Sequence, residues 1–176
     1  CERHGLAMAQ EVEHLLQGPF KSVEPNIQIR SKTLHLPRGK VPAVEAIKER
    51  LDRSWLLADT IAQAETGKDV PSHLDYRVAT WCFGKDLAMV FLEDEVVVDY
   101  ALRMKREFAG DRLWITAYTN DVSTYVVSKR LIGEGGYEVN NSLSTKLSFG
   151  QPEAVTPAVE DQVIGAMREL LPPSFH

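Results

Sequence analysis

Acidic residues and tyrosines are the side chains of this sequence that could form a polar site. Glu93, Asp94 and Glu95 follow a short apolar run, and Tyr125 and Tyr137 lie in a polar stretch further along the chain. The sequence contains no HExxH, CxxC or GxSxG motif and no glycine-rich phosphate loop between a strand and a helix. A structural interpretation of these residues stays open, because acids stabilise helix starts and tyrosines often border a core with their hydroxyls in water.

A strand–helix–strand unit at 87–118 would position these side chains. Apolar runs at its two ends are typical of strands buried on both faces, and apolar residues recur at helical spacing over 97–108. This order predicts parallel strands joined by a right-handed crossover. The acidic turn at 93–95 and the polar loop at 119–138 then leave the carboxyl ends of the two strands, where sites of α/β sheets gather.

The other elements are expected to surround this unit in one domain that covers residues 1–176. Residues 74–83 are expected to pair with the first strand of the unit as a hairpin, so that the sheet is mixed. The predicted fold class is therefore α/β, with a mixed β-sheet and packed helices. The remaining predictions are a strand at 26–36, helices at 2–17, 41–53, 55–66 and 157–171, and a long loop at 139–155.

Composition excludes several classes of protein. Apolar residues make up 44% of the 176 residues and charged residues 26%, which is typical of a globular domain. The net charge of −5 argues against nucleic acid as a partner, and no apolar run reaches the length of a transmembrane segment. Two cysteines are too few for a disulfide framework or a cysteine zinc site. The chain opens in a helical pattern at Cys1, and we interpret it as a piece of a longer protein whose targeting segment would lie upstream.

Three segments resemble the neutral/alkaline (non-lysosomal) ceramidase family, in particular its divergent bacterial branch. They are FLEDEVVVDY at 91–100, NDVSTY at 120–125 and GYE at 136–138. The resemblance covers most of the chain from residue 74 onward and includes the opening helix that follows His4, but it is weak over 20–73. It implies that this chain is the C-terminal part of a ceramidase-like catalytic domain.

The resemblance implies a zinc-dependent hydrolase that cleaves a non-peptide C–N bond in an N-acyl lipid-like or other amphipathic amide. Glu95 and Tyr125 match two of the family's zinc ligands, and Tyr137 matches a catalytic tyrosine that holds the oxyanion. The other two ligands are histidines that lie upstream of this chain, so the chain alone would hold half of the metal site and be nearly inactive. The implied partners are the upstream remainder of the domain and an amide substrate, and the implied location is secreted or periplasmic.

The sequence departs from the family close to these positions. Asp94 stands where many members have glycine, Val122 stands where they have a tyrosine, and a glycine-rich segment replaces an acid-rich one before Tyr137. These departures leave an alternative from a different class. In that alternative the chain is a non-catalytic α/β binding or structural module that kept the fold and lost the metal site.

Overall fold

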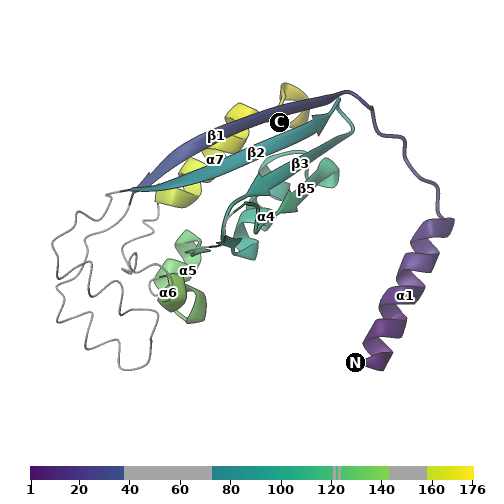
Figure 1. Cartoon of the computed structure of the whole chain (residues 1–176), viewed down its shortest axis with the longest axis horizontal. Coiled ribbons are helices and arrows are strands. Elements are labelled where there is room, and N and C mark those ends of the chain that lie inside the picture. Colours follow the sequence, from purple (N-terminus) through teal and green to yellow (C-terminus); the bar gives the residue numbers. More distant parts are fainter. Residues whose placement is uncertain (38–72, 121, 123, 143–157) are drawn as a thin grey trace.

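The structure is a computed structural model that describes residues 1–37, 73–120, 122, 124–142 and 158–176 (Figure 1). The helices expected between residues 38 and 72 and the start of the last helix lie outside the described residues.

A four-stranded mixed sheet in the order β1-β2-β3-β5 forms the centre of the fold. The strands are β1 (Ile27–Pro37), β2 (His73–Phe83), β3 (Leu87–Leu92) and β5 (Leu113–Thr116). β2 pairs antiparallel with both β1 and β3, whereas β3 and β5 are parallel. The helix α4 (Val98–Glu107) connects the two parallel strands. The predicted mixed sheet, the hairpin and the strand–helix–strand unit are therefore confirmed.

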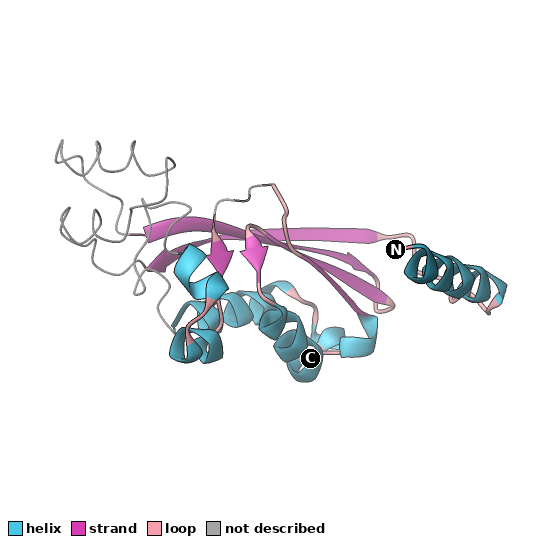
Figure 2. Ribbon diagram, turned by 90° about the horizontal axis from the view of Figure 1, so that it is seen from below, coloured by secondary structure: helices cyan, strands magenta, loops and turns pink. Residues whose placement is uncertain are grey.

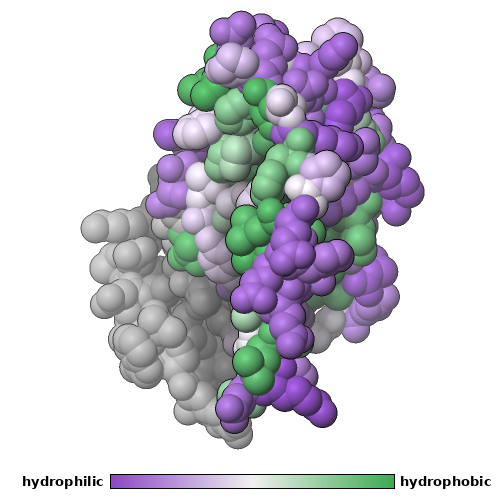
Figure 3. Space-filling model, turned by 90° about the vertical axis from the view of Figure 1, so that its right-hand side faces the viewer, coloured by the Kyte–Doolittle hydropathy of each residue, from purple (hydrophilic) through white to green (hydrophobic). Residues whose placement is uncertain are grey.

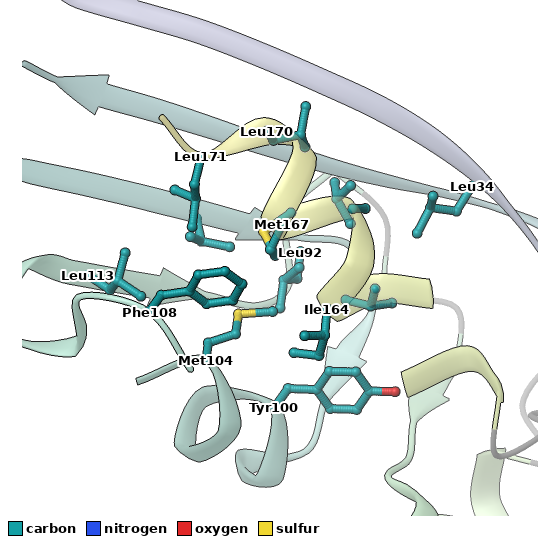
Figure 4. Packing of buried hydrophobic residues seen from close by; sticks show 14 of the residues in the cluster. Leu34, Leu92, Tyr100, Met104, Phe108, Leu113, Ile164, Met167, Leu170 and Leu171 are labelled. Atoms are coloured by element: carbon teal, nitrogen blue, oxygen red, sulfur yellow. The ribbon is translucent and has the colours of Figure 1, made fainter. Parts of the chain in front are cut away.

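The core lies between the sheet and the helices α4 and α7 (Ala158–Leu170), which cover the same face of the sheet (Figure 2). Tyr100 and Met104 of α4 are fully buried because apolar side chains at helical spacing form one face of that helix. Figure 4 shows Leu92 of β3, Met104 of α4 and Met167 of α7 pointing toward one another. Full burial of each such side chain contributes about 1.5–3 kcal/mol, so this layer fixes α4 and the strand ends beside it.

The opposite face of the sheet is apolar and uncovered in the described part of the chain. Ile29, Trp81, Met89 and Trp114 are cross-strand partners and form one row over all four strands. Ile29 is 64% exposed and Trp114 is 61% exposed. The prediction that the apolar runs are buried on both faces is therefore wrong for this face, because the described helices pack only on the other one.

The opening helix α1 (Glu2–Gln17) has the predicted bounds but buries none of its residues. It lies apart from the sheet in Figure 1. Figure 3 shows the molecule from the end where this helix lies, and hydrophobic patches are exposed there among hydrophilic residues. No helix in the described ranges has both the length and the hydrophobicity needed to cross a membrane. The exposed apolar residues of α1 are Leu6, Met8, Val12, Leu15 and Leu16.

The polar stretch after β5 is more ordered than expected. It contains β6 (Tyr125–Val126), α5 (Lys129–Glu134) and α6 (Tyr137–Ser142), so the predicted polar loop at 119–138 is wrong from residue 125 onward, and the predicted loop at 139–155 is wrong for residues 139–142. Residues 143–155 of that loop lie outside the described residues. Ser128 caps α5 by accepting a hydrogen bond from the backbone N–H of Leu131 at 3.2 Å. Elements of two to six residues are too short to produce a periodic pattern, which explains the error.

Candidate active site at the edge of the sheet

Two short parallel strands bring Glu95 and Tyr125 side by side. β4 (Glu95–Val96) pairs with β6, and the register places Glu95 opposite Tyr125. The backbone N–H of Glu95 donates to the carbonyl oxygen of Thr124 at 3.0 Å, and that of Val97 donates to Val126 at 3.2 Å. Neighbouring strands lie about 4.8 Å apart, so the two residues expected to bind zinc are immediate neighbours.

Tyr137 joins the same group of side chains. It is the first residue of α6, and its ring centroid lies 6.2 Å from that of Tyr125, with an angle of 78° between the ring planes. This edge-to-face arrangement is a favourable one for aromatic pairs. Tyr137 is 68% exposed, so a ligand can reach this residue from solvent. The structure thus brings together Glu95, Tyr125 and Tyr137, although they come from three separate elements.

Tyr118 is a member of this group that the sequence analysis did not single out. It follows β5, and its side chain forms a hydrogen bond with Glu95. Its backbone N–H donates to the carbonyl oxygen of Asp94 at 3.0 Å, which holds the end of β5 beside the start of β4. Its position at the carboxyl end of a parallel strand was the signal that could have identified it. We call Glu95, Tyr118, Tyr125 and Tyr137 the rim cluster.

The Glu95 carboxylate raises the pKa of two phenols in the rim cluster. The hydrogen bond with Glu95 raises the pKa of Tyr118. Partial burial, together with the hydrogen bond to Glu95, raises the pKa of Tyr125 to about 12. Both tyrosines therefore keep their protons at neutral pH and donate to the carboxylate. A divalent cation beside these oxygens would act in the opposite direction and favour the phenolate.

Asp94 forms the turn that connects β3 to Glu95 at the start of β4. Its φ of 63° lies in the left-handed region, and its side chain is only 3% exposed. Asp94 Oδ1 accepts a hydrogen bond from the backbone N–H of Thr124 at 3.1 Å. Aspartate is one of the few non-glycine residues that tolerate this backbone conformation, so Asp94 can stand where the ceramidase family often has glycine.

The interpretation of residues 93–95 as acids at a helix start is wrong. The chain turns at Asp94 and continues as β4, and α4 begins only at Val98. The Glu93 carboxylate instead accepts the backbone N–H of Arg77 on β2 at 2.8 Å. Glu93 and Asp94 therefore accept backbone hydrogen bonds that hold the connection between strands, whereas Glu95 accepts hydrogen bonds from Tyr118 and Tyr125.

The rim cluster fits a divalent metal by its donor chemistry. Glu95 offers a carboxylate oxygen and Tyr125 a phenol oxygen at paired positions, and zinc accepts oxygen donors beside imidazoles. The five histidines of the chain lie elsewhere: two on α1, one each on β1 and β2, and one at the C-terminal end. This distribution is consistent with the expectation that histidines from outside this chain complete the metal site.

A separate hollow of about 360 Å³ lies between α4, α5 and the start of α7. It is rich in cations, but Arg103 donates to Glu160 at 2.7 Å and Arg130 to Asp99 at 3.0 Å. Glu160 also accepts the backbone N–H of Lys129 at 2.8 Å. Arg103 and Arg130 are thus paired with acids of neighbouring elements, which is typical of a structural network rather than of an anion site.

Comparisons with protein-family models, with curated proteins and with solved structures found no significant match.

Proposed function

We propose that this chain is the part of a zinc-dependent amide hydrolase that supplies Glu95 and Tyr125 to the metal and Tyr137 to the substrate. The observation that carries the proposal is the β4–β6 pairing, which sets Glu95 beside Tyr125 with the Tyr137 ring 6.2 Å from that of Tyr125. Three residues matched to a family by sequence thus form one cluster at the edge of the sheet.

Each residue of the rim cluster has a distinct role in this proposal. Glu95 offers an anionic oxygen, and Tyr125 offers a phenol oxygen whose proton must leave when the metal binds. Zinc, when bound, supplies a Lewis acid and a water molecule whose pKa is lowered toward about 7. Tyr137, which is largely exposed, donates a hydrogen bond from its hydroxyl to the amide carbonyl oxygen as negative charge develops there.

Tyr118 acts on Glu95 rather than on the substrate. Its hydrogen bond holds the carboxylate in one orientation, and its own backbone is tied to Asp94. A fixed carboxylate loses little freedom when it binds a cation, which favours binding. Tyr118 is therefore a positioning residue of the proposed site.

The proposed partner is the remainder of a larger catalytic domain, which would also bring the two histidine ligands. The uncovered face of the sheet supports this proposal, because Ile29 and Trp114 are each more than 60% exposed in a continuous apolar row. The apolar residues of α1 are exposed as well. Contiguous apolar surface of this kind marks contact sites in folded proteins. The proposed substrate is an N-acyl lipid-like or other amphipathic amide.

The test compares zinc content and amide hydrolysis in the full-length protein. We expect about one rim-bound zinc per chain in the wild type, and affinity at least tenfold weaker in the Glu95→Gln, Tyr125→Phe double variant. Tyr137→Phe should keep the zinc and lose most hydrolysis of a fluorogenic N-acyl amide. Glu134→Gln, which changes an exposed acid paired with Arg130, is the matched control and should change neither.

The alternative is a non-catalytic α/β module. It is favoured by the hydrogen bonds between Glu95 and two phenols, which satisfy the carboxylate without a metal. Under this alternative the full-length protein binds no zinc through Glu95 and Tyr125, and the double variant binds metal as the wild type does. That result would overturn the proposed hydrolase.

A further inference from the structure

We propose a second metal site on the exposed side of the β1–β2 ribbon, formed by His35, His73 and Asp75. We call these three residues the ribbon cluster. The proposed ligand is a divalent first-row transition metal, with Zn²⁺ as the best fit. The site is separate from the rim cluster and does not depend on the function proposed for it.

The strand pattern places all three side chains on one face. Leu34 and Leu36 of β1 are buried in the core, so His35 between them faces the opposite side. The register pairs His35 directly with Asp75 on β2, and His73 lies two residues from Asp75 on the same face. Three potential ligands therefore meet at the end of the ribbon.

The distances between the potential ligand atoms are close to those of a zinc site, so the side chains need to move little to bind the metal. His73 Nε2 lies 3.4 Å from Asp75 Oδ1, and His35 Nδ1 lies 2.6 Å from the same oxygen. Tetrahedral zinc with bonds of about 2.05 Å separates its ligand atoms by about 3.3 Å. The first distance already matches this value. The second is a hydrogen bond that must lengthen by roughly 0.7 Å when a cation replaces the shared proton.

The imidazoles also lie close to each other. The His35 and His73 ring centroids are 4.9 Å apart at an angle of 80°, and one ligand atom from each of the three residues lies within 4.8 Å of the others. The side chains of His35 and Asp75 are about two-thirds exposed, so a metal can enter from solvent without any opening of the core.

The donor set selects the class of metal. Two neutral imidazoles and one carboxylate suit zinc and its first-row neighbours, whereas Ca²⁺ and Mg²⁺ prefer a full shell of oxygen ligands. Three protein ligands leave at least one coordination position for water. A metal in this site would join β1 to β2 at the ribbon end where β1 finishes at Pro37 and β2 begins at His73.

The experiment titrates the full chain, freed of metal by a chelator, with Zn²⁺ by calorimetry and with Co²⁺ by absorption. The starting protein carries Glu95→Gln and Tyr125→Phe, so that the rim cluster does not contribute. We expect about one metal per chain, and an affinity at least tenfold weaker after His35→Ala or His73→Ala. Zn²⁺ should raise the melting temperature of the starting protein and not that of the His35→Ala, His73→Ala variant.

His14→Ala is the matched control, because His14 is an exposed histidine with one acidic neighbour, Glu11, at 3.9 Å. It should leave metal affinity unchanged. The proposal is overturned if His14→Ala weakens binding as much as His35→Ala, or if the starting protein binds no metal. It is also overturned if the ribbon variants bind as tightly as the starting protein. None of these results bears on zinc binding by Glu95 and Tyr125, which is measured with an intact rim cluster.

Discussion

Substitution of Asp94 should separate two physical roles of this residue. Its carboxylate accepts the backbone N–H of Thr124 at 3.1 Å, and its backbone occupies the left-handed region with φ of 63°. Alanine removes the hydrogen bond and keeps the strained backbone. Glycine removes the hydrogen bond and relieves the strain, whereas asparagine keeps an oxygen acceptor and tolerates the conformation.

The magnitudes follow from the burial of both partners. Asp94 is 3% exposed and Thr124 is 9% exposed, so loss of the acceptor leaves a buried N–H without this partner, at a cost of about 1.5–3 kcal/mol. A non-glycine residue in the left-handed region costs about 1–2 kcal/mol more than glycine, and Asp and Asn pay the least of this cost. We therefore expect Asp94→Ala to lower the free energy of unfolding by about 2–4 kcal/mol, Asp94→Gly by about 1–2, and Asp94→Asn by about 0.5–1.

The assay is chemical denaturation of the full chain followed by far-ultraviolet circular dichroism. Asp111→Ala is the control, because the Asp111 side chain is 83% exposed, and it should change the free energy of unfolding by no more than about 0.5 kcal/mol. Equal stability of the alanine and glycine variants would refute the argument from the left-handed backbone. A cost below about 0.5 kcal/mol for both would refute the argument from the hydrogen bond.

Three further measurements test the electrostatics and the packing. The hydrogen bond from Arg103 lowers the pKa of Glu107 below its usual 4.5. The free energy that ionised Glu107 adds to folding is therefore fully present above pH 4.5 and is lost as the pH falls through the lowered pKa. In denaturation measurements at a series of pH values, Glu107→Gln should show a smaller decrease of the free energy of unfolding in acid than the wild type. Burial raises the pKa of Cys82, which is 2% exposed, so in a Cys1→Ser background, which removes the exposed thiol, a thiol reagent at pH 8 should modify Cys82 only as fast as the chain unfolds, and rapid modification of this native variant would contradict its burial. Glu95→Gln should lower the pKa of Tyr125 from about 12, measured as tyrosinate absorbance against a Tyr125→Phe reference, and an unchanged value would show that the carboxylate does not act on this phenol.

The sequence was sufficient to predict the central unit because its signals are local and repeated. The apolar run at 87–92, the helical spacing over 97–108 and the next apolar run lie within about thirty residues, and one rule of connectivity orders them. The same signals could not show whether both faces of the strands are covered. Trp114 lies in an apolar run, yet its side chain is 61% exposed, because coverage depends on what packs against the sheet.

The rim cluster was predictable only in part. Glu95 and Tyr125 were matched by resemblance, but their pairing rests on strands of two residues, which leave no periodic signal. Tyr118 was not among the residues that the sequence analysis assigned to the site. Its link to Glu95 depends on the positive φ of 58° at Tyr118 itself, and a sequence pattern does not reveal a left-handed tyrosine.

The ribbon cluster was beyond sequence analysis for a different reason, and that reason shows why polar groups gather on one side of this sheet. His35 and Asp75 are 40 residues apart, and only the register of β1 on β2 makes them neighbours. Because β1 and β3 both run antiparallel to β2, and β5 is parallel to β3, the carboxyl ends of β1, β3 and β5 point in the same direction. The β1–β2 ribbon continues past the end of β3, since Leu92 pairs with Val78 whereas Pro37 pairs with His73. β2 begins at this end of the ribbon with His73. The strand directions that place Glu95 and the tyrosines on this side of the sheet therefore place both histidines of the sheet on the same side, at the far end of the β1–β2 ribbon. Metal titration of the two clusters in separate backgrounds shows whether this side binds one cation, two or none.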